Sequence, residues 1–77
     1  MMSDAIEQVI DLRRIESHLI HSTIAQRVAH TAADESFWMI ADHDPVELHD
    51  FLIDLGLTVQ TFIISEKEFR VFLGKIA

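Results

Sequence analysis

The chain has 77 residues, enough for one small hydrophobic core, so we expect a single domain over 1–77 with an ordered core at about 6–76. Its 13 Asp and Glu residues outnumber its 6 Lys and Arg residues. The resulting net charge of −7 argues against a nucleic-acid partner, which needs a basic surface, and against an anionic membrane. No cysteine is present, which excludes a disulfide, a thiolate zinc site and a cysteine nucleophile. The first residues do not resemble a signal peptide and no apolar run is long enough to span a bilayer, so we expect a cytoplasmic protein.

The first half of the chain predicts one strand and one helix. Alternating apolar side chains over 6–13 are typical of a half-buried strand. From 17 to 32 the pattern changes, because Ile24, Val28 and Ala32 recur every four residues with polar residues between them. That spacing predicts an amphipathic helix.

The second half predicts a strand, a helix and a hairpin. The continuous apolar run 37–41 is too short for a helix and fits a central strand. Helical spacing returns over 46–55, and Gly56 stands where a left-handed residue would end that helix. The β-rich runs 58–65 and 69–73, separated by three polar residues, predict an antiparallel hairpin.

The order βαβαββ predicts an α+β fold, namely a two-layer sandwich in which two helices cover one face of a mixed four-stranded sheet. A right-handed strand–helix–strand crossover makes the first two strands parallel, so their carboxyl ends meet at one edge. We expect any binding site at that edge, beside the amino termini of the helices.

The segment after the second predicted strand combines two kinds of signal. A capping-box-like start of the helix explains three of its residues: Asp44 as the N-cap, Pro45 at the first helical position and Glu47 three residues after the cap. Asp42 and His43 come before the cap and are not explained by it. These two residues are therefore the better candidates for a binding role.

The crossover brings further polar residues toward Asp42 and His43. Asp11 and Arg13 end the first strand, and His18 begins the first helix, so we expect all five at the ligand-binding edge. His18, His43 and Asp42 have the side chains that hold a divalent transition metal. The same edge could instead bind a small anion through Arg13, the histidines and the helix termini, or could consist only of solvated polar ends.

Other aromatic and histidine residues favour structural roles. His21 shares a helix face with apolar residues and is expected to be partly buried, whereas His30 and His49 are expected to be exposed. Trp38 is expected in the core or as the anchor of an interface, and an outward Phe72 could contact a second copy of the chain.

Four segments along the chain are informative together: Ile10-Asp11-Leu12-Arg13, Glu16-Ser17-His18, Asp42-His43-Asp44-Pro45 and Phe69-Arg70-Val71 to Lys75. Over nearly its whole length the chain resembles, through these segments, the small bacterial family called domain of unknown function 2249. That family is similar to the sulfur-carrier fold (TusA-like, SirA-like), which has the βαβαββ order. The resemblance implies a redox or metalloprotein setting beside hemerythrin-like and nitrogen-oxide respiratory proteins.

The chain departs from this resemblance where sulfur carriers have their chemistry. They carry Cys-Pro-x-Pro at the start of the first helix, whereas residues 15–19 contain neither cysteine nor proline, so persulfide transfer is excluded. Ser17 and Leu19 replace the arginine and the proline that flank the histidine in the family. The site residues that the resemblance carries over are Asp11, Arg13, His18, Asp42, His43, Asp44 and Pro45.

From these observations we expect the protein to be a binding module without cysteine. It would hold a metal, a small anion or a partner protein at the edge around His18, Asp42 and His43. The alternative is a protein–protein interaction domain, as a homodimer or as an accessory to a redox protein or metalloprotein, without a small-molecule site. An enzyme with a His/Asp acid–base pair ranks last, because a chain of this length rarely encloses a cleft alone.

Overall fold

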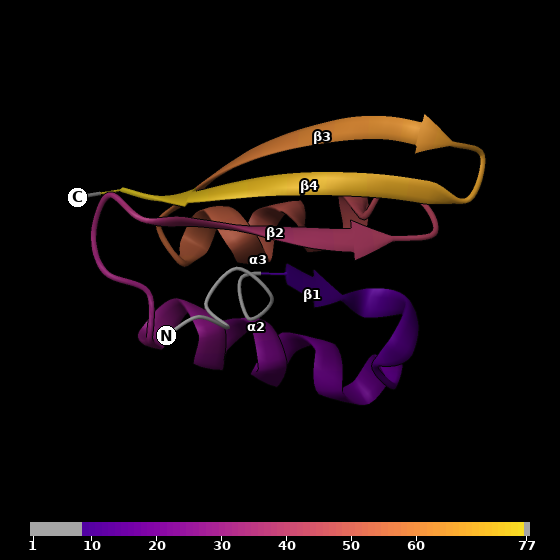
Figure 1. The fold of residues 1–77 in the computed structure, drawn as a ribbon. Helices are drawn as coiled ribbons and strands as arrows, with labels where there is room; N and C mark the ends of the chain where they lie inside the picture. The colour runs from indigo at the N-terminus through magenta and orange to yellow at the C-terminus, as the bar shows by residue number, and fades with distance from the viewer. Residues whose placement is uncertain (1–8, 77) are drawn as a thin grey trace, which may run out of the picture.

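The computed structural model describes residues 9–76 and contains one sheet with helices on one side of it (Figure 1). The strands are β1 (Val9–Asp11), β2 (Ser36–Ala41), β3 (Leu57–Ser65) and β4 (Glu68–Lys75). The α-helices are α2 (Ile20–Ala29) and α3 (His49–Asp54), and three short 3-10 helices are η1 (Leu12–Arg14), η2 (Ser17–Leu19) and η3 (Val46–Leu48).

The sheet has four strands in the order β1-β2-β4-β3 and is mixed, which confirms the predicted α+β fold. β1 and β2 are parallel, with Asp11 opposite Ile40, and α2 forms the crossover between them. β4 is antiparallel to both β2 and β3. The carboxyl ends of β1 and β2 therefore meet at one edge of the sheet, as the sequence predicted.

Alternation along the strands defines the core on the helix side of the sheet. In β2, Phe37, Met39 and Ala41 are buried, and the residues between them are half-buried. Val71 and Leu73 of β4 face the same side and have no exposed surface. α2 covers this face with Ile24 and Val28, and η3 and α3 cover it with Leu48 and Leu52.

The first strand is shorter than predicted at its carboxyl end. Residues 6–8 of the expected strand lie outside the described residues, and the pairing with β2 ends at Asp11. The chain then turns into η1, because the Asp11 carboxylate accepts a hydrogen bond from the backbone N–H of Arg13 at 3.1 Å. Leu12 is buried as the alternation predicted, although it belongs to η1 and not to the strand.

The first predicted helix is also shorter, since α2 ends at Ala29 and Ala32 is exposed. Side chains satisfy the carbonyl groups at this end. Thr31 Oγ1 donates to the carbonyl of Arg27 at 2.6 Å. Lys75 of β4 donates from Nζ to the carbonyls of Val28 and Thr31 at 3.0 and 2.7 Å. A cation from the neighbouring strand thus ends the helix where its dipole is negative.

The second predicted helix begins as η3 and continues as α3. Gly56 follows with φ of +83°, which confirms its predicted left-handed conformation. Within residues 9–76, no helix combines the length and the apolar character needed to cross a membrane.

The face of the sheet opposite the helices carries a group of aromatic rings. Trp38 and Phe72 are neighbours across β2 and β4, with ring centroids 4.9 Å apart. Phe62 of β3 extends the group, with its centroid 5.7 Å from that of Trp38. Trp38 is half-buried by these rings and is not part of the core between sheet and helices.

The role of Lys75 predicts the effect of removing its charge. Lys75→Met keeps most of the aliphatic stem and leaves two carbonyls without their charged donor, so we expect the free energy of unfolding to fall by about 1–3 kcal/mol. Urea unfolding followed by circular dichroism measures this loss. The matched control is Lys67→Met in the exposed β3–β4 turn, and equal losses in the two variants would contradict the assigned role.

Candidate functional site

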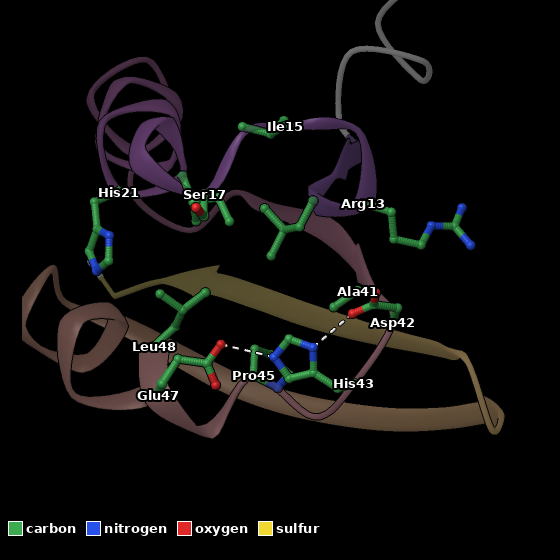
Figure 2. Close-up of a pocket in the computed structure, with 12 residues that line it drawn as sticks. Arg13, Ile15, Ser17, His21, Ala41, Asp42, His43, Pro45, Glu47 and Leu48 are labelled. Carbon is green, nitrogen blue, oxygen red and sulfur yellow. Dashed lines mark hydrogen bonds and ion pairs between the residues drawn. The ribbon is translucent and has the colours of Figure 1, made fainter.

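A pocket of about 360 Å³ lies where the carboxyl ends of β1 and β2 meet the segments that lead into α2 and α3 (Figure 2). One wall comes from η1 and the start of the crossover, and the other comes from the end of β2 and η3. Its lining residues are Leu12, Arg13, Ile15, Ser17, Ile20, His21, Ala41, Asp42, His43, Pro45, Glu47 and Leu48. The pocket is at the edge that the sequence predicted.

His43 lies between two carboxylates on one wall of this pocket (Figure 2). Its Nδ1 is 2.7 Å from Oδ1 of Asp42, and its Nε2 is 2.9 Å from Oε2 of Glu47. A carboxylate only accepts hydrogen bonds, so both contacts are hydrogen bonds only when both ring nitrogens carry a proton. The geometry is therefore that of an imidazolium between two anions, which we name the Asp42–His43–Glu47 bridge.

The electrostatics of the bridge follow from this geometry. Hydrogen bonds to Glu47 and then to Asp42 raise the pKa of His43 above its ordinary value of 6.5. The same bonds lower the pKa of Asp42 and of Glu47. With His43 protonated, the three side chains carry a net charge of −1. All three are more than half exposed, so water and salt screen the bridge.

Asp11 and Arg13 form a separate ion pair near the rim of the pocket. Arg13 Nε donates to Oδ1 of Asp11 and Nη2 donates to Oδ2, each at 2.8 Å. This two-point contact lowers the pKa of Asp11. Because the guanidinium charge is already paired, the structure gives little support to the expected role of Arg13 as the anchor of an anion.

His18 does not join the predicted group. It belongs to η2, its side chain is 73% exposed, and its nearest charged partner is Glu16, with Nδ1 3.6 Å from Oε1. His18 is not among the residues that line the pocket. Within residues 9–76, no three His, Asp or Glu side chains are grouped so that they could hold a metal ion. The structure therefore does not bring the predicted metal ligands His18, His43 and Asp42 together, because η2 turns the His18 side chain to solvent.

The predicted capping box is also corrected. Pro45 has φ of −80° and ψ of 57°, and the N–H of Val46 donates to the carbonyl of Asp44 at 2.8 Å, which makes an inverse γ-turn. The helical segment therefore begins at Val46, and no side chain caps it. The Asp44 carboxylate instead lies 3.7 Å from Nε2 of His49, and Glu47 bonds to His43. Glu47 thus belongs to the pocket wall.

Sequence reasoning missed three polar members of the pocket, Ser17, His21 and Glu47. The spacing of four residues between His43 and Glu47 was an available signal, since such pairs meet on helical turns. His21 was expected to be partly buried; it is exposed, and its ring packs edge-on against Phe51 at 4.5 Å between centroids. His49 was expected to be exposed but is only partly so, and its Nε2 is buried.

The pocket is chemically asymmetric. Six of its lining residues are apolar, namely Leu12, Ile15, Ile20, Ala41, Pro45 and Leu48. The polar side of the pocket is concentrated in the bridge, where Oδ2 of Asp42 and Oε1 of Glu47 take no part in the hydrogen bonds to His43. Such a site offers hydrogen-bond acceptors and negative charge beside an apolar surface.

Comparisons of the chain with protein-family models, curated proteins and solved structures find no match.

The bridge predicts a defined pH dependence of stability for His43→Gln. Because the pKa of His43 is raised, its contribution to the free energy of unfolding is full below pH 6.5 and is lost as the pH rises through that raised pKa. Because the pKa values of Asp42 and Glu47 are lowered, the contribution of these carboxylates to the free energy of unfolding is present above about pH 4.5 and is lost in acid. We therefore expect the destabilisation by His43→Gln to be largest between pH 4.5 and 6.5.

Urea unfolding of wild type and variant across pH 3 to 9 measures this difference. The control is His18→Gln, which removes an exposed ring outside the pocket. A His43→Gln effect that is constant with pH, or that His18→Gln reproduces, would show that the bridge does not form.

Proposed function

We propose that the protein is a small cytoplasmic binding module whose ligand enters the pocket between the ends of β1 and β2. The observation that supports this most is the Asp42–His43–Glu47 bridge on one wall of a pocket of about 360 Å³. That volume falls within the range of about 300–1,000 Å³ typical of small-molecule sites. The ligand class follows from the charges and from the apolar lining.

The favoured ligand is a small molecule with a primary amine or another donor group at one end and an apolar body. The amine would meet the acceptor oxygens Asp42 Oδ2 and Glu47 Oε1, and the body would lie against residues such as Ile15 and Leu48. A small anion, one of the two small ligands expected from the sequence, would face two carboxylates and an arginine that Asp11 already pairs. The geometry therefore favours an amine over an anion.

The relation to the sulfur-carrier fold and to domain of unknown function 2249 is part of the same proposal. The order βαβαββ and the one-sided placement of the helices support it. Because the sequence has no cysteine, the proposal assigns the chain ligand binding at the end of β2 and no persulfide chemistry.

A second candidate function is that of a protein–protein interaction domain. It is favoured by the aromatic group of Trp38, Phe72 and Phe62, which lies on the sheet face away from the helices. This face is separate from the pocket, so the two functions do not exclude each other.

The ligand class is tested by titrating the isotope-labelled protein with n-butylamine, butyrate and butanol while recording NMR spectra. We expect saturable shifts of the His43 ring and of the Ile15 and Leu48 methyl groups with butylamine, and at least tenfold weaker effects with butyrate.

Glu47→Gln removes one acceptor charge at nearly constant volume and should weaken amine binding about tenfold. Asp54→Asn, on an exposed position of α3 outside the pocket, is the matched control and should change nothing. Equal binding of butylamine and butyrate, or equal effects of the two substitutions, would contradict the proposed ligand class.

A further inference from the structure

The outer edge of the sheet at β3 has few of the features that usually protect an edge strand. β3 has nine residues, pairs only with β4, and lies at one end of the strand order (Figure 1). Its sequence, Leu57 to Ser65, contains no charged residue and no proline. Natural edge strands are commonly blunted by charges, by proline or by shortness, because their free N–H and C=O groups accept another strand. The register shift between Ile63 and Ser65 is the only irregularity in the described pairing of β3 with β4.

The same strand carries three consecutive exposed apolar side chains. Phe62 is 46% exposed, Ile63 is 74% exposed and Ile64 is 55% exposed. Single exposed apolar residues are ordinary on protein surfaces, but a consecutive run on an open edge marks a contact site. Pairing of another strand would cover the backbone groups and these side chains together.

We propose that the partner at this edge is a second copy of the chain, whose β3 pairs antiparallel with the first β3 around a two-fold axis. The composition of the strand favours this occupant, because antiparallel pairing of β3 with its own copy sets apolar side chains opposite one another and brings no charged residue of the strand to the contact. The net charge of −7 makes two copies repel each other elsewhere, so the uncharged β3 edge is where they can approach. The nearest charges in sequence, Glu66 and Lys67, have opposite signs and lie in the turn beyond the strand.

The pairing has a defined arrangement. An axis near Thr61, the middle residue of β3, would place Val59 of one copy opposite Ile63 of the other. Both positions face the helix side of the sheet, because they are opposite Leu73 and Phe69 of β4. The product is a closed dimer with one continuous sheet of eight strands. This inference does not depend on the ligand proposed for the pocket.

Concentration-dependent mass measurement tests the dimer directly. Light scattering coupled to gel filtration, at about 10 µM to 1 mM, should give a dimer that dissociates on dilution. Ile63→Lys, a substitution at an exposed position, should raise the dissociation constant at least tenfold because it brings an ammonium group to each side of the contact. Leu19→Lys is the matched control: Leu19 is 44% exposed in η2, outside β3, and its substitution should leave the dimer intact.

A cysteine scan locates the contact, since the chain has no cysteine of its own. Single substitutions from Thr58 to Phe62 should form interchain disulfides with a maximum at one residue near the middle of β3, because only residues close to the axis meet their own copy. Val9→Cys on the opposite edge strand, β1, should not crosslink.

Four results would overturn the proposal. A monomer at 1 mM would exclude the second copy as the partner, even if an unrelated extended peptide bound the edge. Growth without limit would exclude a closed dimer. A dimer that survives Ile63→Lys would place the contact on another surface, as would crosslinking of Val9→Cys at the yield seen in β3.

Discussion

The parallel pairing of β1 with β2 is the constraint from which the rest of the molecule follows. Asp11 is in register with Ile40, so the segments that follow β1 and β2 leave the sheet side by side. One segment forms η1, and the other contains Asp42 and His43. The crossover helix α2 must then return beneath the sheet, which leaves a pocket between the two departing segments. β4 completes the arrangement from the other side, because it pairs with β2 and also ends α2 through Lys75. The pocket is thus a consequence of topology, and its chemistry depends on the few residues that follow each strand.

The chemistry of the pocket is dominated by charges that are already paired. Arg13 contacts Asp11 at two points, and His43 contacts Asp42 and Glu47 through both ring nitrogens. A ligand that binds here must therefore meet the remaining carboxylate oxygens, which makes a donor or a cation a better match than an anion. The exposure of these groups means that the bridge orients the His43 ring more than it stabilises the fold. It also makes the charge of the acceptor wall sensitive to pH above 6.5, because loss of the His43 proton makes the net charge of the bridge one unit more negative.

The sequence predicted the architecture more reliably than the site, for physical reasons. Burial alternation in β2 and the position of Gly56 depend on local patterns, and both are observed. The carboxyl ends of the first strand and of α2 were predicted two and three residues too late, because they depend on a hydrogen bond that the Asp11 carboxylate accepts and on hydrogen bonds that the distant Lys75 donates. The location of the pocket followed from the topology of the sheet, whereas the identity of the side chains that line it depended on local turns. η2 directs His18 to solvent, and the inverse γ-turn at Pro45 frees Glu47 from the predicted capping box.

The end of β2 holds an imidazolium between two carboxylates on the wall of the pocket. Long-range nitrogen–proton NMR correlation of the His43 ring at pH 6.5 tests it most directly, because a histidine of ordinary pKa is half neutral at that pH. We expect both ring nitrogens of His43 to be predominantly protonated in the wild type, and the ring to move toward the ordinary half-neutral state in Glu47→Gln. A His43 ring that is half neutral or more in the wild type, with no response to Glu47→Gln, would show that the bridge does not form.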